Sequence, residues 1–179
     1  MRKFFKVIGV ILLLIIAFVL IAGIFVSKTY HLDKTITINA PKEKVWGNVS
    51  SLQQMMKWSP WLEKDPNAQT SFEGQEGTIG SVYRWKGNKD VGSGNQTITK
   101  IDRPNSIITH LTFIEPFSGE ADSFINLADE GAATKVTWGF DTKYPYPKNI
   151  ILLFVNMDEM MGAEYDKGLS RLKKISESN

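Results

Sequence analysis

The sequence predicts an α+β protein, in which an antiparallel β-sheet stands between helices and follows one apolar N-terminal helix. Three observations predict this fold class. Residues 7–26 form an apolar run without charge, residues 70–143 alternate between apolar and polar positions in short segments, and a helical repeat of apolar residues ends the chain. Alternating segments joined by short glycine- and proline-containing turns are typical of antiparallel hairpins. Helices grouped before and after such strands are typical of the α+β class.

The N-terminal apolar run has the length of a transmembrane helix. Twenty residues at about 1.5 Å per residue extend about 30 Å, which matches the hydrocarbon core of a bilayer. The alternative is a cleavable signal peptide, whose apolar region is usually about 7–15 residues long and ends at a small-residue cleavage site. The sequence at residues 21–25 is a poor cleavage context, and the chain has no cysteine for a lipoprotein anchor. We therefore expect an uncleaved anchor over residues 7–26.

The basic residues predict the orientation of this anchor and exclude one class of partner. Residues 1–6 carry Arg2, Lys3 and Lys6, whereas the linker at residues 27–34 is less basic, so the positive-inside rule places the domain outside the cytoplasm. The first 26 residues hold three of the chain's 21 basic residues and none of its 19 acidic ones, which leaves a net charge of about −1 on the rest. Such a balance does not predict a nucleic-acid-binding face.

The domain expected over residues 35–176 begins with a strand and a helix. Residues 35–39 alternate with a period of two, with Ile36 and Ile38 on one face. Pro41 suits the first turn of a helix, because the N–H that proline lacks has no partner there. Apolar residues then recur at helical spacing as far as Met56, and the helix should end near Lys57, before Pro60.

Six strands are expected next, and the helix that follows them should be long. The strands are predicted at residues 70–73, 81–86, 95–102, 107–115, 120–129 and 133–143, with turns rich in Gly, Asn and Pro between them. From about Lys148 the sequence becomes helical, and apolar residues recur every three or four positions as far as Ile175. A single helix is expected there, with Gly162 as the point at which it would break.

Several stretches together resemble one superfamily. They are TITINAPKEKVWGNVSSL, KWSPWLEKDP, GTIGSVYRWKGNKDVGSGNQTITKIDRPNSI, AATKVTWGFD and YDKGLSRLKK. In order and spacing they resemble the START-like or SRPBCC superfamily, in its polyketide cyclase/dehydrase-like branch, including members with one N-terminal membrane helix. The resemblance covers about residues 33–175. It implies a helix-grip fold, in which a bent antiparallel sheet surrounds a long C-terminal helix and leaves a cavity for lipids or other apolar molecules.

The candidate ligand-binding residues are the aromatic side chains and one methionine that this fold would bring near the cavity. Trp58 and Trp61 are expected at its mouth, although both indoles would equally suit a plug that closes the end of the core. The remaining candidates lie in the strands and on the apolar stripe of the last helix. They are Tyr83, Trp85, Phe113, Phe124, Trp138, Phe140, Met161 and Tyr165. Composition alone leaves open whether they enclose a cavity or a solid core.

Three residues are candidates for acid–base catalysis. Glu115, Asp141 and His110 are the acid–base candidates. Burial of Glu115 beside a cavity would raise its pKa, a similar argument applies to Asp141, and His110 is a lone histidine in a strand. His110 has neither a second nearby histidine nor a cysteine with which to bind a metal, and no phosphate or dinucleotide motif is present, so no metal and no cofactor are expected. The leading hypothesis is a membrane-anchored binder of a hydrophobic or amphiphilic molecule. The alternatives are an enzyme that uses the same cavity and a membrane-tethered protein-interaction module. The sequence does not predict the oligomeric state.

Overall fold

The computed structural model describes residues 2–178, which divide into two compact units. The helical unit consists of the residues up to Tyr30 together with Lys143–Met157. The sheet unit consists of His31–Thr142 together with the residues from Asp158 onward. The two units are described separately below.

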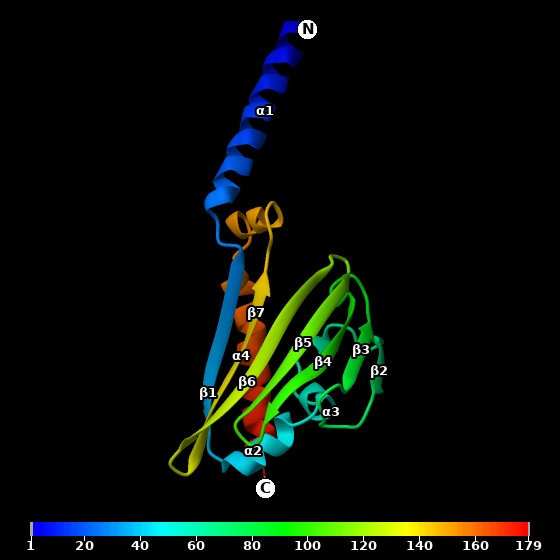
Figure 1. Ribbon diagram of the computed structural model, residues 1–179, viewed down its shortest axis with the longest axis vertical. Coiled ribbons are helices and arrows are strands. Elements are labelled where there is room, and N and C mark those ends of the chain that lie inside the picture. The colour runs from blue at the N-terminus through cyan, green and yellow to red at the C-terminus, as the bar shows by residue number, and fades with distance from the viewer. Residues whose placement is uncertain (1, 179) are drawn as a thin grey trace. The chain divides into compact units, whose positions relative to one another are not determined.

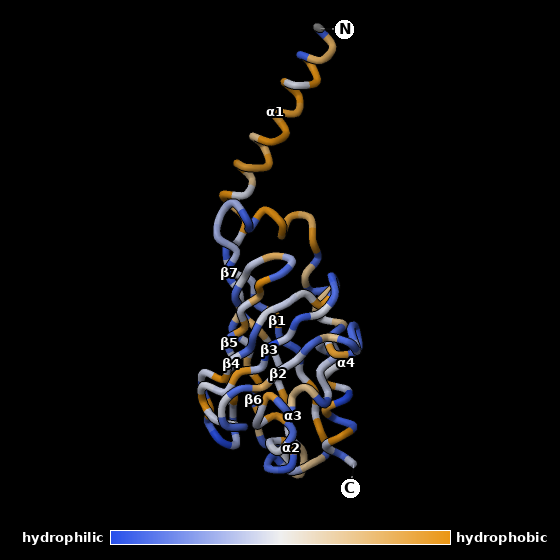
Figure 2. The backbone as a smooth tube through the Cα atoms, turned by 90° about the vertical axis from the view of Figure 1, so that its right-hand side faces the viewer, coloured by the Kyte–Doolittle hydropathy of each residue, from blue (hydrophilic) through white to orange (hydrophobic). Residues whose placement is uncertain are grey.

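The helical unit contains helix α1 (Arg2–Phe25) and the short 3-10 helix η2 (Lys148–Leu153) (Figure 1). Among residues 2–178, α1 is the one helix long and apolar enough to cross a membrane, and its backbone is coloured hydrophobic along most of its length in Figure 2. The expectation of one helix from Lys148 to the end of the chain is wrong. Residues 150–155 are apolar on every side, so they have no polar face for an amphipathic surface helix, and the long helix begins only at Met157.

The sheet unit is built on seven strands in the order β1-β7-β6-β5-β4-β3-β2. The strand pairs from β2 to β7 are all antiparallel, and each strand pairs with the next one along the chain. The strands are β1 (Thr29–Ile38), β2 (Gln69–Glu73), β3 (Val82–Lys86), β4 (Ser93–Asp102), β5 (Ser106–Glu115), β6 (Gly119–Glu130) and β7 (Ala133–Lys143). The predicted α+β helix-grip fold is confirmed, and β2 to β7 lie close to their expected bounds. The first strand is longer than expected, because β1 begins at Thr29, within the residues 27–34 that were expected to form a linker.

The helix expected from Pro41 to Lys57 is two helices, α2 (Lys42–Val49) and α3 (Leu52–Met56). Ser51 is extended and caps the second helix, because its side-chain oxygen accepts a hydrogen bond from the backbone N–H of Gln54 at 3.2 Å. A serine that caps a new helix competes with continuation of the preceding one. The apolar spacing continued across this break, which is why periodicity alone did not reveal it.

Helix α4 (Met157–Glu177) packs on one face of the sheet, here called the inner face. Along β7 the side chains of Val136, Trp138 and Phe140 are buried, whereas Lys135 before them and Asp141 after them are exposed. On α4 the buried residues include Tyr165, Leu169 and Leu172, which form the stripe that the sequence predicts. Gly162 lies inside α4 and does not break it.

Gly168 allows α4 to approach the sheet closely. A Cβ atom at this position would lie 2.6 Å from Cζ3 of Trp138 and 3.3 Å from Cδ of Pro60. We expect Gly168→Ala to lower the free energy of unfolding by about 1–3 kcal/mol, because the added methyl group overfills a packed site. Urea unfolding followed by circular dichroism measures the change.

Gly47 provides the matched control for that substitution. It lies in α2, and a Cβ atom there would meet no other atom within 4 Å. Gly47→Ala should raise the free energy of unfolding by about 0.5–1 kcal/mol, since alanine favours the helix. If Gly168→Ala and Gly47→Ala change the free energy of unfolding in the same direction, the close approach of α4 to the sheet at Gly168 is contradicted.

Candidate functional site

Five aromatic side chains meet between β7 and α4 and form what we call the core cluster: Trp58, Trp61, Trp138, Phe140 and Tyr165. The rings of Trp138 and Tyr165 stack with their centroids 4.0 Å apart. Trp58 meets the edge of Trp138 at 4.9 Å, and Trp61 contacts both members of the stacked pair. Segments far apart in the sequence thus converge on one aromatic centre.

The tandem tryptophans of the KWSPWLEKDP stretch differ in their surroundings. Trp58 is only 1% exposed, and its indole N–H donates to the carbonyl of Asn48 at 2.9 Å, so it is part of the core. Trp61 is half-buried at the margin of the cluster. The two indoles therefore do not form an exposed aromatic patch, which was the feature expected of a protein-interaction module.

Ion pairs hold the same stretch against α4. The Glu63 carboxylate pairs with Lys167 at 2.8 Å and with Arg171. Hydrogen bonds from Lys167 and then from Arg171 lower the pKa of Glu63. Next to it, Lys64 pairs with Glu164 of α4 at 2.9 Å. These contacts fasten the segment that follows α3 to α4.

A second set of aromatic side chains lies on the part of the sheet formed by β2, β3 and β5. Phe72, Tyr83, Trp85 and Phe113 form what we call the inner aromatic row, with neighbouring ring centroids 5.0, 5.9 and 6.0 Å apart. Tyr83 is buried, but Phe72 is 42% exposed and Phe113 is 38% exposed. This row therefore leaves a large aromatic area accessible to a ligand.

Two side-chain hydrogen bonds join neighbouring strands on the inner face of the sheet. The Gln96 amide donates to Oγ1 of Thr109 at 2.8 Å, and the Trp138 N–H donates to Oγ of Ser123 at 3.3 Å. In the register of the sheet, Gln96 is paired with both Tyr83 and Leu111. Burial raises the pKa of the Tyr83 hydroxyl, which stays neutral and able to donate a hydrogen bond at neutral pH.

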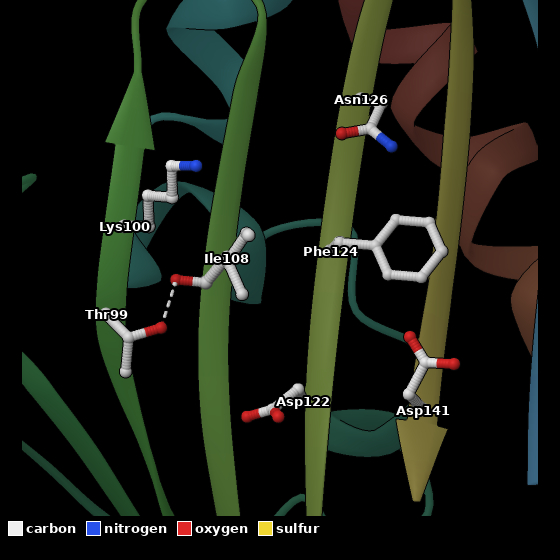
Figure 3. A pocket seen from close by; sticks show the side chains of 7 residues that line it. All are labelled: Thr99, Lys100, Ile108, Asp122, Phe124, Asn126 and Asp141. Carbon is white, nitrogen blue, oxygen red and sulfur yellow. Dashed lines mark hydrogen bonds between the residues drawn. The ribbon is translucent and has the colours of Figure 1, made fainter.

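The opposite, outer face of the sheet carries two histidine–aspartate pairs. Nδ1 of His31 lies 2.7 Å from Oδ1 of Asp141, and Nδ1 of His110 lies 2.7 Å from Oδ1 of Asp122. A depression of about 490 Å³ on this face is lined by Thr99, Lys100, Ile108, Asp122, Phe124, Asn126 and Asp141 (Figure 3). With three charged side chains in its lining, this depression does not suit an apolar ligand.

The structure separates several residues that the sequence placed in one candidate site. Phe124 lies in the outer-face depression and stacks on His31 at 5.9 Å, away from the other aromatic candidates. Asp141 and His110 also lie on the outer face, whereas Glu115 is exposed at the end of β5. The three acid–base candidates therefore do not converge. Within residues 2–178, no group of three His, Cys, Asp or Glu side chains is arranged to hold a metal ion.

Two residues of the inner face were not among the candidates. Phe72 lies opposite Tyr83 in the register of β2 and β3, and Gln96 lies on the other side of Tyr83. Alternation within residues 70–73 was a usable signal for Phe72, since a lone phenylalanine between polar residues marks one face of a strand. Nothing in the sequence around Gln96 separates it from an exposed strand residue.

His31 is expected to make stability depend on pH. Hydrogen bonds to Asp141 and then to Asp33 raise the pKa of His31 above its ordinary value of 6.5. The protonated ring is therefore favoured in the folded state, so its contribution is complete below about pH 6.5 and is lost as the pH rises through the raised value. Urea unfolding across this range should show the loss in the wild type and a smaller one in Asp141→Asn. If the stability of the wild type and of Asp141→Asn depends on pH in the same way, the proposed contribution of His31 is contradicted.

The sequence of the domain matches one family model. The match covers residues 29–177, and the family is described as polyketide cyclase / dehydrase and lipid transport. The chain belongs to this family. The match includes all seven strands and the whole of α4, so the resemblance seen in the sequence is confirmed. No curated protein matches the chain.

Several solved structures resemble the chain in fold, at low sequence identity. A protein from Nitrosospira multiformis has a TM-score of 0.61 and 17% identity, with 83% of this chain and 97% of that chain covered. A protein from Thermobifida fusca has a TM-score of 0.61 and 15% identity, with coverage of 82% and 92%. The major latex-like protein 151 of Panax ginseng has a TM-score of 0.59 and 15% identity, with coverage of 85% and 100%. At these identities the likeness shows the fold alone.

Proposed function

We propose that this family member is a membrane-anchored binding protein for a hydrophobic or amphiphilic small molecule. The observation that carries the proposal is the inner aromatic row, because Phe72 and Phe113 at its two ends remain exposed, whereas the core cluster is buried or half-buried. Apolar surface removed from water contributes about 25 cal/mol per Å² to binding, before the costs of association.

The proposed ligand contacts divide the sequence candidates into two groups. Tyr83, Trp85 and Phe113 would touch the ligand, together with Phe72, and Met161 is half-buried on α4. The core cluster would serve as the closed wall of the site. Gln96 and the neutral Tyr83 hydroxyl supply polar groups beside the aromatic row, which would suit an amphiphile with one hydrogen-bonding end.

Retention of α1 as an anchor is supported by its contact with Asn149. The Asn149 side-chain amide is fully buried and donates to the carbonyls of Gly23 at 2.7 Å and Val26 at 3.0 Å. Removal of α1 would take away the Gly23 carbonyl, one of the two acceptors of this donor, and the loss of such a partner costs about 1–3 kcal/mol where the donor stays buried. We therefore place the protein in a membrane through α1, with the sheet unit outside the cytoplasm as the flanking charges indicate.

A reaction at the same site is not part of the proposal. The family description includes cyclase and dehydrase activities. An acid–base reaction needs at least one positioned group within reach of the substrate, and Glu115, Asp141 and His110 do not meet on the inner face.

Ligand binding is tested by native mass spectrometry of the full chain, purified in detergent and released from the micelle. We expect a co-purifying apolar molecule in the wild type and a reduced amount in Trp85→Ala, because Trp85 joins Tyr83 to Phe113 in the row. Phe117→Ala is the matched control, since Phe117 is an exposed aromatic residue in the turn between β5 and β6.

Two outcomes would contradict the proposed function. The first is a wild-type protein that carries no apolar molecule and takes up none from a lipid extract. The second is equal loss of the bound molecule in Trp85→Ala and in Phe117→Ala, which would show that the ligand adheres to exposed apolar surface in general.

A further inference from the structure

The helical unit exposes an apolar segment outside α1. Residues 144–155 include Tyr146, Ile151 and Leu153, each close to half exposed, and Phe154, which is 71% exposed. No charged residue occurs between Lys148 and Asp158. Soluble proteins rarely leave so much contiguous apolar surface in water, and such a patch marks a contact with a partner or a membrane.

This segment is fastened to the C-terminal end of α1. Besides the Asn149 hydrogen bonds to Gly23 and Val26, the backbone N–H of Tyr144 donates to the carbonyl of Lys28 at 2.9 Å. The Ile150 side chain packs over Gly23, where a Cβ atom would overlap it. The segment therefore lies at the level at which the apolar run of α1 ends. For a helix that spans a bilayer, this level is the boundary between acyl chains and headgroups.

The charge of the helical unit suits an anionic lipid surface. The unit contains six of the chain's 21 basic residues and none of its 19 acidic ones. Three of these, Lys28, Lys143 and Lys148, belong to the part that follows α1. Lysines beside an apolar surface extend their ammonium groups toward lipid phosphates while their methylene groups stay in the apolar layer.

We propose that residues 144–155 form an interfacial lipid-binding surface, which enters the headgroup–acyl boundary of the bilayer crossed by α1 and places Lys143 and Lys148 among anionic headgroups. The proposal rests on the proposed membrane anchoring of α1 and adds a second attachment point contributed by a distant part of the sequence. Aromatic and aliphatic side chains next to lysines are the residues that interfacial segments use.

The absence of cysteine from the chain permits a direct test. Three single-cysteine variants of the full chain, Phe154→Cys, Ile16→Cys and Ser71→Cys, are labelled with an environment-sensitive fluorophore. They are reconstituted into vesicles of phosphatidylcholine and phosphatidylglycerol in equal parts, which contain lipids with a nitroxide at a shallow or a deep acyl position. Ile16 reports insertion of α1, and Ser71, exposed on β2, reports a surface in water.

We expect a blue-shifted emission at position 154 with stronger quenching by the shallow nitroxide, stronger quenching by the deep nitroxide at position 16, and no quenching at position 71. Quenching at position 16 without quenching at position 154 would overturn the interfacial surface and leave the anchor intact. Absence of quenching at both positions would overturn the anchor as well. A blue shift at position 154 without quenching by lipid would indicate a second protein chain on the segment, and the proposal would fail.

The lysines are tested on the Phe154→Cys background. Lys143→Glu together with Lys148→Glu should weaken quenching at position 154 in the mixed vesicles and should have a smaller effect in vesicles of phosphatidylcholine alone, because only the mixed surface is anionic. An equal effect in both kinds of vesicle would overturn the assignment of the lysines to anionic headgroups.

Discussion

Trp138→Ala is expected to lower the free energy of unfolding by about 3–5 kcal/mol, the range found when a large aromatic residue is removed from a core. Trp138 stacks on Tyr165, meets Trp58 and Trp61 at its edges, and donates a hydrogen bond to Ser123. The substitution leaves a cavity at the place where β7, α4 and the segment after α3 meet. It also leaves the buried Ser123 hydroxyl without one of its partners.

Urea unfolding of the full chain in detergent, followed by far-ultraviolet circular dichroism, measures this loss. Trp85→Ala is the matched control, because it removes the same side chain from the half-exposed inner aromatic row. We expect the control to lose less than half as much stability. If both variants lose the same free energy, the core cluster is not the centre of the packing, and the distinction between a structural and a ligand-binding set of aromatic residues fails.

The second large effect is expected from charges within α1. Leu13 and Ile16 both lie in the middle of the apolar run and are exposed. Each arginine at the centre of a transmembrane helix costs about 2.5–3.5 kcal/mol, so Leu13→Arg with Ile16→Arg should oppose insertion by about 5–7 kcal/mol. We expect the wild type to sediment with membranes after carbonate extraction and the double variant to remain in the supernatant.

Leu13→Val with Ile16→Val is the matched control for the charged pair, since it preserves the apolar character of α1. This variant should stay with the membranes. If the arginine variant also resists extraction, α1 is not the anchor, and the proposed attachment of the protein through this helix is wrong. If both variants are released, the result would reflect a folding defect, which circular dichroism of the released protein would reveal.

Much of the fold could be predicted from the sequence because its patterns are local. The alternation along β7 and the three-to-four spacing along α4 each reflect one buried face of one element. The break between α2 and α3 was missed because Ser51 acts through a single hydrogen bond to Gln54, and apolar spacing is insensitive to such a bond. The run at residues 150–155 was assigned to a helix because an all-apolar stretch has no periodicity from which to exclude one.

The candidate site was less predictable, because it depends on which face of the sheet each residue occupies. Trp138 and Phe124 both follow regular alternation, yet one lies in the core cluster and the other stacks on His31 on the outer face. A strand pattern identifies two faces and does not say which of them a distant helix will cover. Here Phe124 lies on one face together with Asp122 and Asn126, which border the same depression.

The order of the sheet has a consequence for how the chain folds during synthesis. Strands β2 to β7 each pair with the strand made just before or after them, so these hairpins close as they emerge. Strand β1 pairs only with β7, and β1 begins four residues after the end of α1. The first strand made must therefore wait, with both edges unpaired, until almost the whole domain has been translated. Pairing of β1 with β7 closes a long loop, which has a large entropic cost. We therefore expect this pair of strands to form last. A chaperone that acts on this protein would have to shield β1 throughout that interval.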